Sequence, residues 1–159
     1  MPSEIHVVEG SVVPQLPGWE HASIPEAKLE GYVLCPEHEK GANEARVFSS
    51  ALGLAQQDSP YLREQIQEGL SESEAVLRKA KTDYGQEWEV LVPVEGRNEL
   101  TRYVATKWII PNGSHPRPRL STLYVEKSKR KLREVEERYA RRKAEPSSPG
   151  GPRPVRDAT

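Results

Sequence analysis

The sequence predicts an α+β domain in which N-terminal helices pack on a small antiparallel β-meander, followed by a basic C-terminal helix. Three patterns support this prediction. Apolar residues recur at helical spacing between residues 43 and 70, and they alternate with polar residues between 86 and 125. Residues 126–143 combine helix-forming residues with a strong basic charge.

The helices are expected in the first half of the chain. Residues 1–16 form an irregular lead-in with room for one short strand, and a single domain then covers residues 17–125. Pro25 begins a helical turn. Two amphipathic helices follow, one over 43–52 with Gly53 available as its cap, the other from Ser59–Pro60 to about residue 70.

Three strands joined by turns are expected next, over 86–94, 100–110 and 119–125. Residues 75–82 carry mixed signals and form either the tail of the preceding helix or a first strand. Trp88 and Trp108 lie at the core parity of their strands, so we expect both to be buried on neighbouring strands.

A basic helix is expected over residues 126–144, because 126–143 hold nine Lys/Arg and four Glu, a charge of +5. The whole chain carries −1, so the remainder carries −6. The helix offers one narrow apolar stripe, so we expect its first turns to pack partly and the segment past the stripe to project into solvent. The stripe comprises Leu132, Val135 and Tyr139, and the projecting basic residues are Arg141, Arg142 and Lys143. Residues 145–159 are rich in proline and glycine and are expected to be disordered.

The composition narrows the function classes. A net charge of −1 over 159 residues argues against a histone-like or nucleic-acid coat protein. Cys35 is the one cysteine, which excludes an internal disulfide and favours a reducing, cytoplasmic location. We expect no Sec-type signal peptide and no membrane association, because no apolar run of suitable length occurs. No zinc-ligand spacing, Walker loop or GxGxxG motif occurs, so no metal and no cofactor is expected.

Three polar constellations could carry chemistry. The first, at residues 36–41, places His38 and Lys40 just before a helix N-terminus, where an imidazole can move protons and backbone amides can bind an anion. The second places Thr106 and Trp108 on one face of a strand. Each also has a plainer role, the first as an exposed polar turn and the second as a core strand.

The third constellation lies in the last strand and the loop before it. Strict alternation would put Arg119 and Ser121 on one face, and Thr122 and Tyr124 on the other. The guanidinium of Arg119 suits a phosphate, although a plain surface arginine is an equally good interpretation. Together the constellations offer a proton acceptor, a proton donor and a cation, which are the groups that metal-free RNA cleavage requires.

Residues 17–125 resemble a bacterial family of unassigned function. The resemblance rests on motifs that occur in the same order in this chain: Lys28–Leu34, Pro36, His38, Lys40–Gly41, Ala45–Phe48, Leu52–Gly53, Tyr84–Gln86, Thr106, Trp108, Pro118–Leu120, Thr122 and Tyr124. The chain departs from the family pattern at Glu44, where a lysine is usual, and at Ser121, where an aliphatic residue is usual.

The family's paired helices and small sheet are similar to the barnase, EndoU, colicin and RelE group of ribonucleases. This implies a metal-independent endoribonuclease of bacterial toxin type, which cleaves RNA by transesterification and is countered by a cognate immunity or antitoxin protein. The residues expected to act in catalysis are His38, Lys40, Thr106, Arg119 and Thr122. Those expected to contact RNA are Arg46, Trp108 and Tyr124.

A non-catalytic binding module is the alternative: a phage or mobile-element accessory protein, or an antitoxin-like partner. The acidic domain and the basic helix support it, because such helices commonly dock on partners. The two hypotheses predict different structures. The ribonuclease requires its five catalytic residues to converge in one cleft, whereas the binding module disperses them and exposes the apolar stripe of the last helix.

Overall fold

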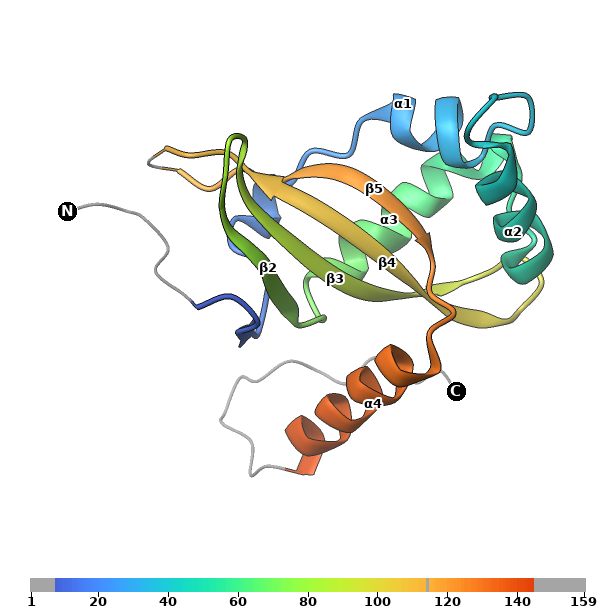
Figure 1. Ribbon diagram of the computed structural model, residues 1–159. Coiled ribbons are helices and arrows are strands. Elements are labelled where there is room, and N and C mark those ends of the chain that lie inside the picture. Colours follow the sequence, from blue (N-terminus) through green and yellow to red (C-terminus); the bar gives the residue numbers. More distant parts are fainter. Residues whose placement is uncertain (1–7, 114, 145–159) are drawn as a thin grey trace.

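The computed structural model describes residues 8–113 and 115–144, and it has the expected α+β class. A five-stranded antiparallel sheet, in the order β1-β2-β3-β4-β5, is covered by α1, α2 and α3 on one side and by α4 on the other (Figure 1). We call these the helical face and the α4 face. The strands are β1 (Val12–Val13), β2 (Ala75–Thr82), β3 (Gly85–Glu95), β4 (Thr101–Ile110) and β5 (Arg119–Val125). The helices are α1 (Glu26–Lys28), α2 (Ala42–Leu52), α3 (Ser59–Leu70) and α4 (Lys129–Ala144), with a π-helical turn over Leu29–Val33.

The order of elements differs from the expectation at the sheet's first edge. The short lead-in strand β1 precedes the helices and pairs with β2, so the described sheet is two strands larger than the predicted meander. Residues 75–82 form a strand rather than a helix tail. Their apolar residues Ala75, Val76 and Leu77 are consecutive, so both faces of the strand are buried at this end and no alternation is visible in the sequence.

The helices begin and end where their sequence signals predict. Gly53 ends α2 in the left-handed conformation, with φ of 64°. At the start of α3, Pro60 occupies the first turn, where its missing N–H is not needed. Leu62, Ile66 and Leu70 then recur at a spacing of four and are buried against the helical face.

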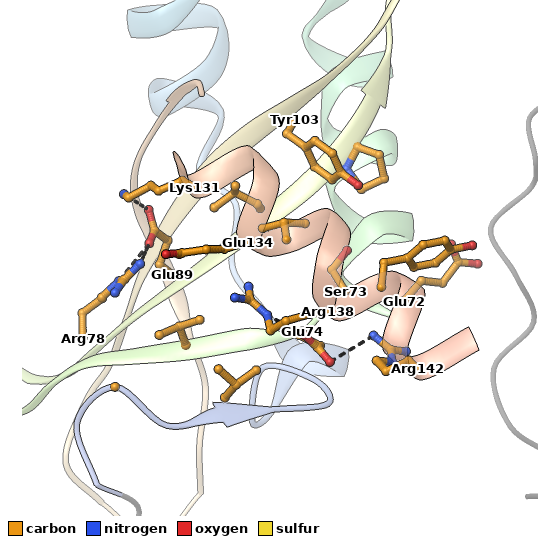
Figure 2. A pocket seen from close by; sticks show the side chains of 17 residues that line it. Glu72, Ser73, Glu74, Arg78, Glu89, Tyr103, Lys131, Glu134, Arg138 and Arg142 are labelled. Atoms are coloured by element: carbon orange, nitrogen blue, oxygen red, sulfur yellow. Dashed lines mark hydrogen bonds and ion pairs between the residues drawn. The ribbon is translucent and has the colours of Figure 1, made fainter. Parts of the chain in front are cut away.

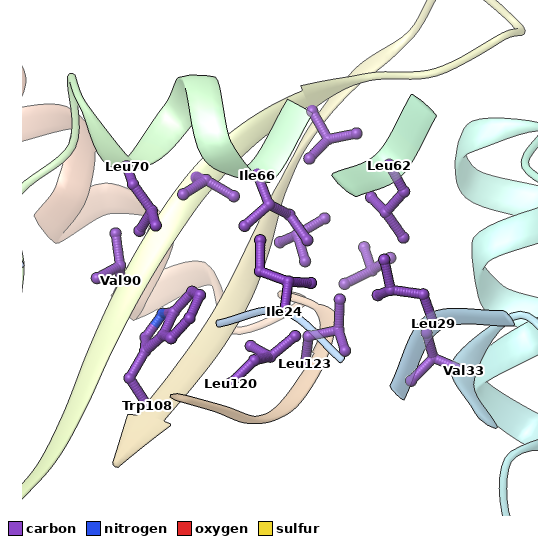
Figure 3. Close-up of a cluster of buried hydrophobic side chains, with 14 of the residues drawn as sticks. Ile24, Leu29, Val33, Leu62, Ile66, Leu70, Val90, Trp108, Leu120 and Leu123 are labelled. Carbon is purple, nitrogen blue, oxygen red and sulfur yellow. The ribbon is translucent and has the colours of Figure 1, made fainter. Parts of the chain in front are cut away.

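The core of the domain lies between these helices and the sheet. Trp88 and Trp108 are directly opposite each other on β3 and β4, and both are 0% exposed, as the alternation predicted. Figure 3 shows Trp108 beside Leu120 and Leu123 of β5, with Ile66 and Leu70 of α3 above them. Large side chains from β3, β4, β5 and α3 therefore pack together on this face.

A β-bulge in β5 overturns the predicted faces of the third constellation. Trp108 pairs with Leu120, but its neighbour Lys107 pairs with Thr122, so Ser121 is an extra residue. Arg119 pairs with Ile109, which brings Arg119 to the same face as Thr122 and Tyr124. The prediction that Arg119 and Thr122 lie on opposite faces is wrong, because strict alternation cannot anticipate an inserted residue.

Helix α4 begins three residues later than expected. The Ser128 hydroxyl accepts a hydrogen bond from the Lys131 amide at 3.3 Å, which is a serine cap at the helix start. The expectation that Arg142 projects into solvent is wrong, because it lies 3.7 Å from a Glu74 carboxylate oxygen. Arg141 is exposed as expected. The predicted tail over 145–159 lies outside the described residues, as does the Lys143 side chain. Within the described segments, no helix has the length and apolar character needed to cross a membrane.

Candidate functional site

His38 organises the turn that leads into α2. Its Nδ1 accepts hydrogen bonds from the backbone amides of Lys40 and Gly41, both at 2.9 Å. Its ring meets Tyr32 edge-on, with 4.7 Å between ring centroids. A Cβ at Gly41 would collide with the Tyr32 carbonyl oxygen, which explains why this turn uses glycine. One ring nitrogen of His38 is therefore committed to local structure.

The other predicted groups near α2 are exposed. Lys40 extends from the turn, and Arg46 donates to Asn43 one turn earlier at 3.1 Å. Glu44, which stands where the family pattern has lysine, is half-buried in the first turn of α2. These side chains lie around one helix end and outside the sheet.

Thr106 and Trp108 lie inside the core. The Thr106 hydroxyl donates to the Val90 carbonyl oxygen at 2.7 Å and accepts from the Trp108 indole N–H at 2.8 Å. Both side chains are 0% exposed. The Trp88 indole is matched in the same way, because it donates to Gln86 Oε1 at 3.0 Å. In the Thr–Trp motif, the threonine hydroxyl is therefore the hydrogen-bond acceptor that a buried indole N–H needs.

Arg119, Thr122 and Tyr124 lie on the α4 face, on the opposite side of the sheet from Thr106. Lys107 joins them, because it pairs with Thr122 and its Nζ lies 5.8 Å from the centroid of the Tyr124 ring. The structure thus groups three of the predicted site residues with a lysine. It places Thr106 and Trp108 in the core and leaves His38, Lys40 and Arg46 around the start of α2, so the five proposed catalytic residues do not share one cleft.

A buried carboxylate, Glu89, lies in the middle of the α4 face and was not among the predicted site residues. It is 1% exposed, and Arg78 of β2 donates to its Oε1 through both Nε, at 2.8 Å, and Nη2. Lys131 of α4 donates to Oε2 at 3.1 Å, and Lys107 of β4 lies 3.9 Å from the same oxygen. Three cations from three elements therefore meet at one carboxylate.

The cations determine the protonation state of Glu89. Burial alone would raise its pKa, but hydrogen bonds and charge from Arg78 and Lys131 outweigh burial and hold the pKa below the ordinary value of 4.5. Glu89 is therefore ionised at neutral pH. A buried charge is tolerated here because its partners satisfy both carboxylate oxygens.

A cavity of about 450 Å³ lies between the α4 face and α4 itself (Figure 2). We call it the α4 cavity. Its apolar walls come from both sides: the sheet and β1 contribute Val12, Val76, Leu91, Pro93 and Tyr103, and α4 contributes Val135 and Tyr139. Charged residues stand at its two ends. One end holds Arg78, Lys131, Glu89 and Glu134, and the other holds Arg138, Arg142, Glu72 and Glu74.

Ion pairs tie α4 across the cavity. Besides the Lys131–Glu89 pair near its start, Arg138 Nε donates to Glu74 at 2.8 Å, and Arg142 lies 3.7 Å from the same carboxylate. Two members of the apolar stripe, Val135 and Tyr139, face the cavity between these ties. The stripe therefore points toward the chain's own sheet across a hollow.

The sequence held a signal for this site. Glu89 lies between Trp88 and Val90, which have the core parity of the strand, so alternation predicts that the Glu89 side chain is on the opposite face. Its cationic partners could not be identified in the same way. Arg78 lies in the segment left undecided between helix and strand, and Lys131 lies 42 residues further along the chain.

Across residues 8–113 and 115–144, no group of three or more His, Cys, Asp and Glu side chains is arranged to hold a metal ion. The buried Glu126 Oε1 has no hydrogen-bond partner among the described residues and lies 3.9 Å from Lys131 Nζ.

Comparison with known proteins gives one match. The model of a family described as a domain of unknown function, DUF6883, matches residues 15–127. No curated protein matches the chain, and no solved structure matches it. The expected similarity to ribonuclease toxins therefore has no support from a matched protein.

Proposed function

Since the chain belongs to the DUF6883 family of domains of unknown function, we propose that it is a non-catalytic binding module whose ligand occupies the α4 cavity. The cavity itself carries the proposal, because it combines unfilled apolar surface with charged side chains in one hollow. Small-molecule sites typically have this composition and volumes of roughly 300–1,000 Å³. A cavity of about 450 Å³ lies within that range.

The direction of the apolar stripe favours a small ligand over a docked protein. A partner that bound through Val135 and Tyr139 would need these side chains to face outward, whereas both line the cavity. The basic helix thus acts as a cover over the sheet. Docking of a protein on an outward stripe loses its main support, and occupation of the cavity replaces it.

The hydrogen bonds of two proposed catalytic groups also favour binding over catalysis. The Thr106 hydroxyl is buried and both donates and accepts. His38 Nδ1 already accepts two backbone amides. Groups committed to the fold in this way are poor candidates for moving substrate protons.

A neutral fluorescent probe tests cavity binding directly. N-Phenyl-1-naphthylamine, which brightens in apolar surroundings, is expected to bind the wild-type protein at one site. Val135→Trp should abolish binding, because the larger indole would occupy part of the cavity that Val135 lines. Leu100→Trp is the matched control, since Leu100 is an exposed residue outside the cavity. If both variants bind the probe as wild type does, the α4 cavity is not a binding site.

An endoribonuclease of toxin type is the second candidate, and one observation favours it. Glu89, Lys107 and Thr122 form a row across β3, β4 and β5. Arg119 lies on the same face, where it pairs with Ile109, two residues along β4 from Lys107. A carboxylate could accept the 2′-hydroxyl proton, and the cations could stabilise the charge on phosphorus. On this proposal the chemistry would lie on the α4 face rather than at His38.

RNA cleavage in the presence of EDTA distinguishes the two candidates. The binding module predicts no cleavage by the wild-type protein. Cleavage by wild type and loss of cleavage in Glu89→Gln would instead establish the ribonuclease on the α4 face. Loss of cleavage in His38→Ala with retention in Glu89→Gln would return the active site to the start of α2.

A further inference from the structure

The charges around the α4 cavity balance one another. Each end of the cavity holds two cations and two carboxylates, so neither end has an excess of either sign. Each of the four cations forms an ion pair with a carboxylate of the same wall: Arg78 and Lys131 with Glu89, and Arg138 and Arg142 with Glu74. The cations of the wall are therefore already compensated without a ligand.

A charged ligand would have to compete with these ion pairs. An acid that approached Arg78 would meet Glu89, which already accepts two hydrogen bonds from the guanidinium. An acid at Arg138 would meet Glu74 in the same way. An amine would likewise add a charge to an end that is already balanced. Because an ion is unfavourable beside apolar walls unless a partner offsets it, the paired charges favour an uncharged ligand.

Aliphatic side chains offer such a ligand apolar surface on two sides. On the sheet, Val76 pairs with Glu89, and Leu91 lies two residues along β3 on the same face. On α4, Val135 lies four residues, or about one helical turn, beyond Lys131. All three aliphatic side chains line the cavity. A hydrocarbon body that removes them from water would be held by the hydrophobic effect.

One polar group of the wall, the Tyr103 hydroxyl, is available to the ligand. Tyr103 pairs with Pro93, and both residues line the cavity (Figure 2). Among the residues that the structure describes, none forms a hydrogen bond with this hydroxyl. Burial, together with the charges of Glu136 and Tyr139, raises the pKa of Tyr103 above its ordinary value of 10.0. The phenol therefore keeps its proton at neutral pH and can donate a hydrogen bond.

From this arrangement we propose that the α4 cavity binds a small uncharged molecule, with a hydrocarbon body against the aliphatic wall and one hydrogen-bond acceptor at the Tyr103 hydroxyl. This inference rests on the proposed binding function and specifies its ligand class. Ketones, esters, ethers and alcohols have this chemistry, because each joins a neutral oxygen to hydrocarbon. Acids and amines do not fit, since either brings a charge that the balanced wall does not offset.

Competition with N-phenyl-1-naphthylamine tests the charge preference. The competitors 2-octanone, octanoate and octylammonium have hydrocarbon chains of similar length and differ in the charge of the head group. The ketone is expected to bind the wild-type protein about tenfold more tightly than either ion, or better, at neutral pH. Displacement by octanoate or octylammonium at the same concentration as the ketone would overturn the proposal.

A change at Glu89 tests the reason for this preference. Glu89→Gln leaves Arg78 and Lys131 without their carboxylate, so octanoate should gain about tenfold in affinity relative to 2-octanone. Glu137→Gln is the matched control, because Glu137 is exposed on α4 and outside the cavity wall. An unchanged ratio of the two affinities in folded Glu89→Gln would overturn the proposal, since the ion pairs would not set the preference.

A change at Tyr103 tests the hydrogen bond. Tyr103→Phe should weaken the binding of 2-octanone about threefold to tenfold and leave 1-octene unchanged, because the alkene has no oxygen to accept the bond. Tyr84→Phe is the matched control, since Tyr84 is exposed and outside the cavity wall. Equal affinity of the wild type and Tyr103→Phe for the ketone would overturn the proposal.

The outcomes for the ligand class and for the proposed function are separable. If the neutral probe binds the wild type, Val135→Trp abolishes that binding, and octanoate competes as well as 2-octanone, the binding module stands and the uncharged ligand is wrong. If Glu89→Gln fails to fold by circular dichroism, the competition in the wild type and in Tyr103→Phe decides. If the neutral probe does not bind the wild type, the proposed function fails together with this inference.

Discussion

The two faces of the sheet are covered in opposite ways. On the helical face, α3 and its neighbours pack large apolar side chains against Trp88 and Trp108 in one buried cluster. On the α4 face, a single helix is tied by ion pairs to Glu89 and Glu74, and its apolar side chains border a cavity. The helical face is therefore closely packed, whereas the α4 face keeps a cavity lined by apolar and charged side chains.

Several residues of the sequence motifs support the fold. Thr106 satisfies the Trp108 indole, Gln86 satisfies the Trp88 indole, and Gly41 allows close approach of the Tyr32 carbonyl. A buried, satisfied polar group constrains its neighbours as strongly as a catalytic group does. A polar motif in a small domain is therefore weak evidence for chemistry until its burial is known.

Truncation of one leucine on each face should give the largest contrast. Leu77→Ala removes a fully buried side chain from the packed helical face and should lower the free energy of unfolding by about 3–5 kcal/mol. Leu91→Ala should cost only about 1–2 kcal/mol, because Leu91 borders a cavity, where a side chain lacks neighbouring atoms on one side. Urea denaturation measures both. Equal costs would mean that the α4 face is packed as tightly as the helical face.

The two threonines offer a second, smaller contrast. Thr106→Val leaves the buried Trp108 indole without its acceptor and should cost about 1–3 kcal/mol. Thr122→Val, on the half-buried α4 face, should change the free energy of unfolding by about 0.5 kcal/mol or less. Thermal denaturation of both variants provides the measurement. A Thr106 variant as stable as wild type would return that hydroxyl to the list of candidate functional groups.

The pH dependence of stability should report on Glu89. Its pKa in the folded protein is below the ordinary value of 4.5, so its charge stabilises the fold above that value, and this contribution is lost as the pH falls through the folded pKa. Stability of the wild type should therefore fall more steeply below pH 4.5 than that of Glu89→Gln. Urea titrations at a series of pH values measure the slopes. Glu134→Gln, which alters an exposed carboxylate, should follow the wild-type curve, and parallel curves for all three proteins would refute the prediction.

The smallest effect on global stability is expected at the ion pairs between Glu74 and the C-terminal half of α4. Glu74→Gln weakens the pairs with Arg138 and Arg142, which are partly exposed, so the free energy of unfolding should change by about 1 kcal/mol or less. Local opening should nevertheless increase, because α4 has little apolar contact to replace the lost pairs. Hydrogen exchange of the amides over residues 138–142 should accelerate, while exchange in α3 stays unchanged. Unchanged exchange in α4 would show that the helix is held by other contacts.

Sequence patterns alone determined the class of the fold and most of its elements. Helix starts and ends depend on local chemistry, such as Pro60 in a first turn and the left-handed Gly53, so they are visible in a short window. The burial of Trp88 and Trp108 followed from strand alternation, which records one buried face. Function could not be reached in this way, because His38 and Thr106 have the same residue types whether they bind a substrate or support the fold.

Only the tertiary structure decided which side chains lie on the same face of the sheet and which of them form ion pairs. The bulge at Ser121 moved Arg119 to the side of Thr122, and an inserted residue leaves no periodic trace. Arg78, Glu89 and Lys131 come from two strands and a distant helix, so their meeting depends on strand register and on where α4 docks. Such contacts arise from long-range packing, whereas sequence patterns report local geometry. The α4 cavity also depends on long-range packing, because it lies between α4 and strands that are distant in the sequence.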